Sequence, residues 1–380
     1  MPELPRWRRQ RIYGGAPGER TICVTGDVSG DGVEDIVIAS RGPRPEVLWL
    51  GRAADGSWQS HVIGEGQPLA AGGFLADING NGRLDFVAGT PASDNCVFWW
   101  ENPPDATQPW IRREIFRMPG PMSHDQLVAD IDGDGRPEVY FWNQMGDSLF
   151  CAPVPQDPTV SPWPGVQVVA SGLREEGLAA ADLDGDGRLE LVAGQSWYRP
   201  PGLPGGNWQR FAFAEGFLSP RVAVADFKGD GRPEIILSEG DATIYGPRQG
   251  RGRYGRVARC RPGDDIAALW QVEILRDDLL DPHSLVVADF DGDGSPDLFV
   301  GELGDPAGQD EHPPAQRIWY NRQGRLQEEI IDVGLGTHES KAIRLDGVTG
   351  IVCKPFRTLR SDAPRPTDID AIHLWLPEFE

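Results

Sequence analysis

An acidic motif that recurs six times constrains the fold more than any other feature of the sequence. The copies read "GDVSGDGVEDIVIA" from Gly26, "ADINGNGRLDFVAG" from Ala76, "ADIDGDGRPEVYFW" from Ala129, "ADLDGDGRLELVAG" from Ala181, "ADFKGDGRPEIILS" from Ala225 and "ADFDGDGSPDLFVG" from Ala288. Alternate carboxylates on a glycine-rich turn are typical of a loop that binds a hard cation. A decayed seventh copy, "HESKAIRLDGVTGIVCKP" from His338, keeps the flanking pattern and loses the acids.

The segments on both sides of each acidic loop have the composition of strands. In the sixth copy "LVVA" precedes the loop and "LFV" follows it, both short and rich in β-branched or aromatic residues. An EF-hand needs flanking helices and an acid at position 12, whereas this copy has its fourth acid, Asp297, at position 9. The motif therefore predicts a strand–loop–strand cation site.

Two further strands follow each copy. The third is aromatic: "VLWL", "VFWW", "LFCA", "SWYR", "TIYG", "RIWY" and "IHLWL". The fourth, in most units, ends in an apolar residue, as in "SWQSHVI" and "PWIRREI". Four strands in a unit of roughly 50 residues are the pattern of a propeller blade.

Seven such units account for the whole chain and predict an all-β, seven-bladed β-propeller as a single domain over 1–380. The last unit lacks a fourth strand, and the N-terminal segment "RWRRQRI", Arg6–Ile12, precedes any first strand. We therefore expect strand 6–12 to complete the seventh blade, which closes the sheet edges that a propeller otherwise exposes.

On these repeats the chain resembles the FG-GAP/VCBS-type repeat propellers over nearly all of its 380 residues. The resemblance implies a seven-bladed fold with cation-binding loops between strands. It does not fix a function, because such propellers serve as adhesion modules, lectin-like binders and enzymes.

The predicted calcium ligands stand at positions 1, 3, 5 and 9 of five regular loops. They are Asp27, Ser29, Asp31 and Asp35; Asp77, Asn79, Asn81 and Asp85; Asp130, Asp132, Asp134 and Glu138; Asp182, Asp184, Asp186 and Glu190; and Asp289, Asp291, Asp293 and Asp297. We expect up to five structural calcium ions, with the second loop weaker because two asparagines reduce its charge. In the remaining loop Lys228 stands at position 3, and its ammonium is expected to neutralise Asp226, Asp230 and Glu234 in place of an ion.

Three histidines share one register, six residues before the lead aspartate or its aligned position. The register reads Thr21, Ala71, His124, Glu176, Pro220, His283 and His338. At about 3.3 Å per residue, roughly 20 Å separates His283 from Asp289, so the two lie at opposite ends of the strand and cannot share an ion. We therefore expect His124, His283 and His338 to form a cluster where the innermost strands converge. His61, His312 and His373 fall outside the register and are interpreted as packing or surface residues.

Polar residues near that end of the blades are the candidate ligand contacts. Asp125, Arg221 and Glu339 follow the register position by one residue, and Glu176 occupies it in the fourth blade. Glu239, Glu302 and Lys354 stand near the ends of second strands, and Arg357 and Arg360 follow in the last loop. Trp197 and Tyr198 are expected in a loop, where they could stack on a sugar.

The histidine register supports two hypotheses. It resembles the histidine-rich sites of propeller-type polysaccharide lyases and of the propeller part of aldos-2-ulose dehydratase, which implies a lyase or dehydratase acting on a carbohydrate or related polar molecule. In that hypothesis His124, His283 and His338 supply the base or hold Zn, Mn or Fe, Arg221 and Lys354 stabilise charge, and Tyr198 is the acid. A hydrolase or isomerase uses similar groups. The alternative is a non-catalytic module that binds a glycan, another small molecule or a protein.

Composition limits the partners. A net charge of −22 argues against nucleic acid and anionic membranes, and no apolar run reaches membrane-spanning length. The N-terminus has no apolar signal-peptide core, and five cysteines without metal spacing predict reduced, buried thiols. These features predict a cytoplasmic protein, or a secreted one if a signal segment has been removed.

Overall fold

Seven four-stranded antiparallel sheets make up the described part of the chain. The computed structural model describes residues 4–14, 20–202, 206–304, 312–355 and 371–379. Within these residues 28 strands form the seven sheets. Six sheets contain four strands that follow one another along the chain, and the seventh combines β26, β27 and β28 with β1. The predicted class, an all-β seven-bladed β-propeller with four-stranded blades, is confirmed.

The chain separates into two compact units, which are described in turn. The four-blade unit comprises 18–182 and 186–211. Its strands are β2 (Arg20–Gly26), β3 (Asp35–Ser40), β4 (Glu46–Arg52) and β5 (Trp58–Glu65); β6 (Phe74–Ala76), β7 (Asp85–Gly89), β8 (Cys96–Glu101) and β9 (Ile111–Arg117); β10 (Ser123–Ala129), β11 (Glu138–Asn143), β12 (Ser148–Pro153) and β13 (Gln167–Ser171); and β14 (Leu178–Ala181), β15 (Glu190–Ala193), β16 (Ser196–Arg199) and β17 (Gln209–Ala212). A short 3-10 helix, Gln144–Gly146, follows β11.

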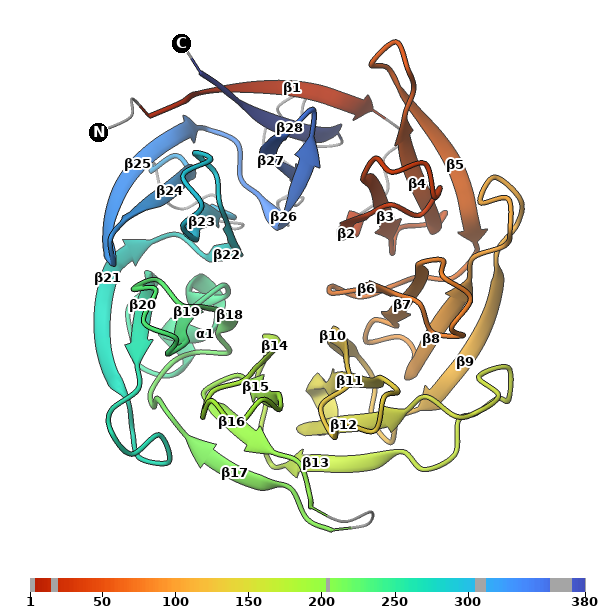
Figure 1. Ribbon diagram of the computed structural model, residues 1–380, viewed down its shortest axis with the longest axis horizontal. Coiled ribbons are helices and arrows are strands. Elements are labelled where there is room, and N and C mark those ends of the chain that lie inside the picture. Colours follow the sequence, from red (N-terminus) through yellow and green to blue (C-terminus); the bar gives the residue numbers. More distant parts are fainter. Residues whose placement is uncertain (1–3, 15–19, 203–205, 305–311, 356–370, 380) are drawn as a thin grey trace. The chain divides into compact units, whose positions relative to one another are not determined.

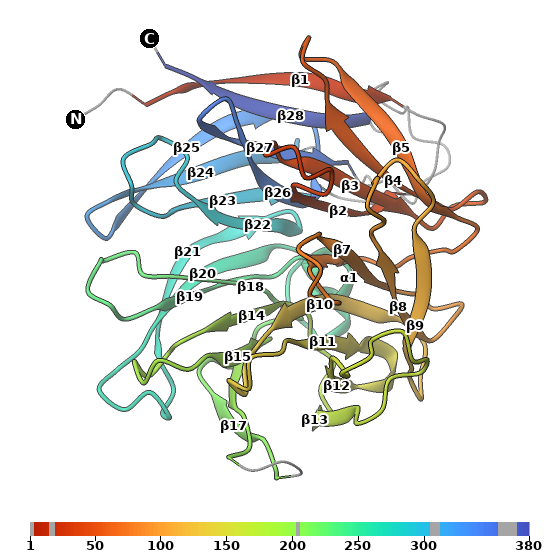
Figure 2. The ribbon, with the colours of Figure 1, turned by 45° about the vertical axis from the view of Figure 1, so that its right-hand side comes forward.

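The three-blade unit comprises 1–17, 183–185 and 212–380. Its strands are β18 (Arg221–Ala225), β19 (Glu234–Ser238), β20 (Gly255–Arg261) and β21 (Gln271–Leu279); β22 (Pro282–Ala288), β23 (Asp297–Glu302), β24 (Ala315–Arg322) and β25 (Arg325–Val333); and β26 (His338–Leu345), β27 (Val348–Lys354), β28 (Ala371–Glu378) and β1 (Arg6–Gly14). Figure 2 shows β22 to β25 following one another side by side.

The N-terminal strand completes the last blade, as the sequence predicted. β1 pairs antiparallel with β28, with Arg6 opposite Glu378 and Trp7 opposite Pro377, and Figure 1 shows the two strands side by side. The Trp7 indole donates a hydrogen bond of 2.8 Å to the Tyr320 hydroxyl of the preceding blade. The first and last segments of the chain are thus held in one sheet and tied to its neighbour.

The cores lie between neighbouring blades of each unit. Second strands such as β7 and β11 are buried along their whole length, because blades of the same unit cover both of their faces. This explains their continuous apolar runs, which would alternate with polar residues in a sheet with one wet face. Tryptophans fill much of the space, and Trp99, Trp142 and Trp197 are fully buried.

The five cysteines lie in strands, are buried, and form no disulfide in the described residues, as predicted. No helix in the described ranges has the length and apolar character needed to span a membrane.

One predicted strand is wrong. The segment "TIYG", 243–246, was expected to be the third strand of the fifth blade, but it lies in helix α1 (Ala242–Arg248), and β20 is the third strand. The helix belongs to an insertion between β19 and β20, which the buried Glu239 holds through Arg251 and Arg256. The sequence pattern missed this because β20, "GRVARCR", carries arginines where other third strands carry aromatic residues.

Candidate functional site

The register histidines stand at the beginnings of the first strands of three blades. His124 is the second residue of β10, His283 the second of β22 and His338 the first of β26. All three are 4–5% exposed. In each strand the pairing register shifts directly at or after the histidine, so a bulge sets its orientation.

In the three-blade unit, five residues form what we call the paired-histidine cluster: Arg221, His283, His338, Glu339 and Lys354. The imidazole rings of His283 and His338 stack, with centroids 3.9 Å apart and planes inclined by 23°. Each of the five side chains belongs to a residue no more than 7% exposed. The sequence had placed all five near this end of the blades, and the structure brings them together.

Each ring of the pair has a cationic neighbour. Arg221 Nη2 lies 3.3 Å from Nδ1 and 3.2 Å from Nε2 of His283, and 2.7 Å from Glu339 Oε1. Lys354, which ends β27 directly opposite His338, contacts Nδ1 of that ring through its ammonium group. Arg221, Lys354 and Lys341 carry three positive charges, and Glu339 and Asp241, which lies near His283, carry two negative ones, so one positive charge is in excess and the cluster is suited to a negatively charged group.

Glu339 is held in an unusual backbone conformation. Its φ is +60°, in the left-handed region that costs a non-glycine residue of order 1 kcal/mol. Its carboxylate lies 2.7 Å from Arg221 through one oxygen and 3.3 Å from Lys341 through the other. Strained residues of this kind occur where a side chain must be aimed at a site.

A transition metal has a donor set here. His283, His338 and Glu339 each offer one ligand atom, all within 4.8 Å of one another, and two imidazoles with a carboxylate suit Zn, Mn or Fe. The positive charges of Arg221 and Lys354 oppose a cation at the same place, because both contact these ligands directly. The donor types fit a metal, and the surrounding charge favours an anion.

His124 lies in the four-blade unit with its own carboxylates. Its Nδ1 is 3.5 Å from Asp125 and its Nε2 is 3.8 Å from Glu176, which also accepts a 2.5 Å hydrogen bond from Gln144. Asp125, with φ +42°, accepts a hydrogen bond from the Gly177 amide. The expectation that all three histidines share one site stays a prediction.

Trp197 and Tyr198 are not available to a ligand. Both lie in β16, both are 0% exposed, and Trp197 stacks on Phe211 with centroids 4.2 Å apart. The expectation that Trp197 and Tyr198 lie in a loop is wrong, because β15 and β16 are joined by Gly194 and Gln195 alone, whereas the predicted third strand "SWYR" is confirmed as β16. Burial raises the pKa of Tyr198 to about 12, so this phenol is neither placed nor poised to be the proton donor.

Glu239 and Glu302 hold the backbone rather than a ligand. Both are 0% exposed. Glu239 accepts hydrogen bonds from the Leu218 amide and from the guanidinium groups of Arg251 and Arg256. Glu302 accepts them from the amides of Leu280 and Ala315 and from Arg317. Their expected substrate contacts are therefore incorrect, since these carboxylates satisfy buried donors.

Arg357 and Arg360 lie outside the described residues.

The sequence reasoning missed the insertion beside His283. A side chain at Gly240 would meet the His283 ring at 2.9 Å, so the insertion backbone lies against it. Asp241, the N-cap of α1, offers a carboxylate oxygen within 4.8 Å of a His283 ring nitrogen. The motif "SEGD" contains both residues, and reading it as a loop beside β22 could have identified the aspartate.

The acidic loops have the predicted strand–loop–strand form. Each lead aspartate accepts backbone hydrogen bonds within its own loop, as Asp130 does from Gly133 and Gly135. The two glycines have φ of +74° and +88°, which requires glycine at both places.

The acid at position 9 begins the second strand and is buried. Asp85 and Asp297 are 0% exposed, Asp35 is 1% and Glu138 is 4% exposed. Burial raises the pKa of Asp85, Glu138 and Asp297 to about 7 and that of Asp35 to about 6. Among the described residues no cationic side chain pairs with these four carboxyls, so a bound cation would supply the missing charge.

Three of the loops gather their acids closely. Oxygens of Asp130, Asp132, Asp134 and Glu138 lie within 4.8 Å of one another, and so do oxygens of Asp182, Asp184 and Glu190 and those of Asp289, Asp291 and Asp297. Oxygen donors at this spacing fit calcium. In the Asp289 loop Arg322 is also present, 2.6 Å from Asp291 and 3.1 Å from Asp293.

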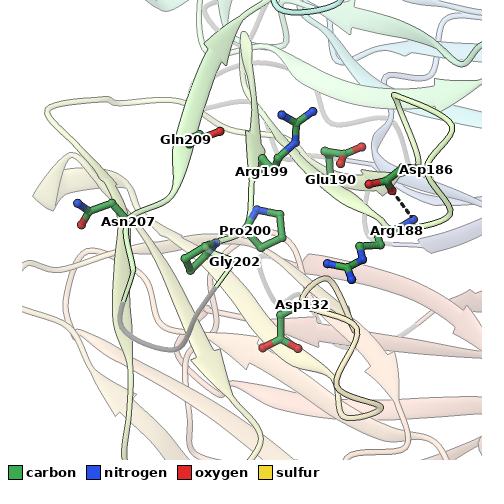
Figure 3. A pocket seen from close by; sticks show the side chains of 10 residues that line it. Asp132, Asp186, Arg188, Glu190, Arg199, Pro200, Gly202, Asn207 and Gln209 are labelled. Carbon is green, nitrogen blue, oxygen red and sulfur yellow. Dashed lines mark hydrogen bonds between the residues drawn. The ribbon is translucent and has the colours of Figure 1, made fainter.

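The loops of the second and fourth blades have further local features. In the second blade Asn79 donates a 3.3 Å hydrogen bond to Glu101, a carboxylate that the sequence reasoning did not count toward this loop. In the fourth blade Asp186 and Glu190 line a pocket of about 260 Å³ with Arg188, Arg199 and Asp132 of the preceding loop (Figure 3).

The role predicted for Lys228 is wrong. No ion pair joins Lys228 to Asp226, Asp230 or Glu234 among the described residues, and its side chain lies beside Gly324. Glu234 pairs with Arg259 and Arg261. That this loop binds no metal, or binds it weakly, stays a prediction.

The repeats match a known family. Residues 27–88, 77–141 and 130–193 each match the FG-GAP-like repeat. The chain thus contains FG-GAP-like repeats in a seven-bladed β-propeller fold, which confirms the resemblance drawn from its loops.

Solved structures share the fold at low identity. The biofilm matrix protein Bap1 of V. cholerae is 11% identical, with 98% of this chain and 91% of that chain covered and a TM-score of 0.54. BBS1N, in a complex with ARL6DN, is 10% identical, with coverage of 99% and 98% and a TM-score of 0.55. The exotype rhamnogalacturonan lyase YesX is 14% identical, with coverage of 98% and 75% and a TM-score of 0.50. At these identities the similarity shows the fold alone. No curated protein matches the chain.

Proposed function

We propose that the protein is a carbohydrate-active lyase that eliminates across a C–O bond of an acidic sugar, with the paired-histidine cluster as its catalytic centre. The observation that carries the proposal is the stacked pair His283 and His338 with a cation against each ring. Elimination beside a carboxylate needs a base, a proton donor and positive charge for the enolate, and this cluster contains all three.

His283 is the better base. The carboxylates of Glu339 and Asp241 each have an oxygen within 4.8 Å of this ring. Together they would offset the Arg221 guanidinium, 3.2 Å from Nε2, and stabilise the imidazolium that forms when the ring takes the proton next to the sugar carboxylate. His338 is the better acid. Lys354 donates to its Nδ1, which places the ring proton on Nε2. As that proton passes to the leaving oxygen, the Lys354 ammonium gives a proton to Nδ1, so the ring stays neutral.

Arg221 and Lys354 stabilise the charge that develops. As the C–H bond breaks, the electron pair moves toward the carboxylate, and the C–O bond then breaks to leave a carbon–carbon double bond conjugated with that carboxylate. Both cations are almost wholly buried, where their interaction with the extra negative charge is stronger than in water. The step consumes no oxidant or reductant.

A second form of this proposal has a transition metal bound to the cluster. Zn, Mn or Fe on His283, His338 and Glu339 would act as a Lewis acid toward the carboxylate. We favour the metal-independent form because Arg221 and Lys354 already contact these ligands and carry the same charge as the metal.

The test is an elimination assay on acidic polysaccharides, including pectic and uronate-rich chains, read by the ultraviolet absorbance of the conjugated product. The wild type should form product, and His283→Asn and His338→Asn should each lower the rate by about 10²- to 10⁴-fold. His61→Gln, a histidine outside the cluster, is the matched control and should keep the rate. Elemental analysis and added chelator separate the metal-bound from the metal-independent form.

A folded protein that forms no product from any of these substrates would overturn the enzyme proposal. Because the cluster residues are so little exposed, the same assay should be accompanied by a binding measurement with the free uronate. Binding that depends on Lys354 but produces no elimination would assign the alternative function, a ligand-binding propeller.

We also propose that calcium stabilises the acidic loops. The buried position-9 carboxyls and the converging oxygens of the Asp130 and Asp289 loops support this role. Each ion would fix the turn between the first two strands of its blade.

A further inference from the structure

In the fifth blade, a pair of arginines neutralises the buried carboxylate that begins the second strand. β19 begins with Glu234, the position-9 acid, which is 2% exposed. Arg259 donates to Glu234 through Nε at 2.9 Å and through Nη2 at 2.5 Å, and Arg261 donates through Nε at 3.0 Å. Two guanidinium groups therefore occupy both oxygens of this carboxylate.

The strand register shows which residue Arg259 has replaced. Arg259 pairs with Ile236, two residues into the second strand. At the same place Trp49 pairs with Val37, Trp99 with Val87, and Trp197 with Val192. An arginine thus stands in a position that is a buried tryptophan in three other blades, and it is 1% exposed.

Arg259 is satisfied on all sides. Its Nη1 donates a 2.8 Å hydrogen bond to the Gly324 carbonyl of the next blade, and its guanidinium lies 5.3 Å from the Phe227 ring centre. A charge this deeply buried is tolerated when it is paired and hydrogen-bonded. Lys228 packs beside the same glycine, away from the loop acids.

The acids of this loop do not converge either. Within the described residues, Asp226, Asp230 and Glu234 form no group of closely spaced ligand atoms, unlike the acids of the Asp130 and Asp289 loops. The described acids of the Asp27 and Asp77 loops form no such group as well, so the two arginines, and not the acid spacing, distinguish the fifth blade. A divalent cation at Glu234 would have to displace two charged hydrogen-bond donors and would leave the Arg259 guanidinium buried without its partner. The residues of this loop therefore do not fit calcium.

We infer that Arg259 and Arg261 form a built-in cation that permanently replaces calcium in the fifth blade, so that this blade is held by a buried ion pair and the 226–234 loop binds no metal. The inference concerns cation occupancy and does not depend on the elimination chemistry. It assigns to these arginines the role that the sequence pattern had given to Lys228.

Calcium stoichiometry provides the first test. Bound calcium is measured by equilibrium dialysis and elemental analysis on the wild type, Asp226→Asn and Asp130→Asn. Both variants remove a lead aspartate, so they form a matched pair. Asp130→Asn should lose one ion per chain, and Asp226→Asn should lose none. Loss of an ion from Asp226→Asn overturns the inference, and a wild type without calcium overturns it as well, since there would be no ion to replace.

A double-mutant cycle provides the second test and is read as Tm in excess chelator. Arg259→Met should lower the Tm by about 4–6 °C, because it leaves Glu234 buried with less compensation. Glu234→Met in the Arg259→Met background should restore part of the loss, and added calcium should not rescue Arg259→Met. A Tm within about 1 °C of wild type for Arg259→Met, or full rescue by calcium, contradicts a built-in cation. If Arg259→Met does not fold, the stoichiometry of Asp226→Asn still decides.

Discussion

Glu239→Gln should destabilise the three-blade unit and disturb the surroundings of His283, because Glu239 holds the insertion that carries α1. Its two oxygens accept six hydrogen bonds: from the Leu218 and Arg256 amides, twice from the Arg251 guanidinium and twice from that of Arg256. Burial alone would raise the pKa of Glu239, but the hydrogen bonds from Arg256 and Arg251 outweigh it and hold the pKa below its usual value. A glutamine side chain has one acceptor oxygen, and its NH2 group adds two hydrogen-bond donors at a place where six donors already point at the side chain.

The magnitude follows from these contacts. Hydrogen bonds to a charged group contribute about 1.5–3 kcal/mol each to stability. Because the Arg251 and Arg256 side chains are 26–30% exposed, water replaces part of the hydrogen bonding that their guanidinium groups lose in the variant. The free energy of unfolding should therefore fall by about 3 kcal/mol, which is the lower end of the range for breaking a buried ion pair. With an unfolding entropy of about 2.1 cal/mol/K per residue over 380 residues, the Tm should fall by about 4 °C.

The assay is thermal unfolding followed by circular dichroism, with Glu65→Gln, an exposed glutamate of β5, as the matched control. The pH dependence gives an independent reading. A carboxyl whose folded pKa is lowered stabilises the protein above its unfolded pKa, and this stability is lost as the pH falls through the folded pKa. The Tm difference between wild type and Glu239→Gln should therefore shrink in acid. A difference of less than about 1 °C at neutral pH, or one that grows in acid, would refute the assignment of Glu239 as a structural anchor.

Three further predictions address the core, the cation loops and the thiols. Trp197→Ala should cost about 3–5 kcal/mol in the free energy of unfolding, measured in denaturant, since a fully buried indole is removed; a surface role for this residue predicts almost no cost. Arg322→Ala should tighten calcium binding at the Asp289 loop by about tenfold in calorimetric titrations, because it removes a cation that competes for Asp291 and Asp293; unchanged or weaker binding would show that the arginine does not compete. All five cysteines should resist a thiol-specific reagent at neutral pH and react after denaturation, because they are buried. Burial also raises the pKa of the Cys151 and Cys260 thiols to about 12. Rapid labelling of the native protein would contradict this prediction.

Local patterns were enough to predict the blades and their loops. Alternating acids on glycine turns, flanked by short apolar runs, gave each inner hairpin, and the position-9 acid lies where the count placed it, at the beginning of the second strand. The pairing of Arg6–Gly14 with the last blade was also predictable, because one strand was missing at one end and one was in excess at the other. Even the histidines were found by register, since a fixed spacing from the lead aspartate fixes the position along a strand.

Side-chain partners were not predictable in this way. The sequence could not show that Trp197 is buried against Phe211 and Tyr198 against the third blade, that Glu239 and Glu302 satisfy buried amides and guanidinium groups, or that Glu234 pairs with Arg259 rather than Lys228. These partners lie on other strands, and their distance along the chain says nothing about their distance in space. The sequence by itself determined the repeat, the strands and the register of the candidate residues, because these depend on local periodicity. Only the tertiary structure decided which polar groups are left to act on a ligand, because that depends on which of them the packed blades have already paired.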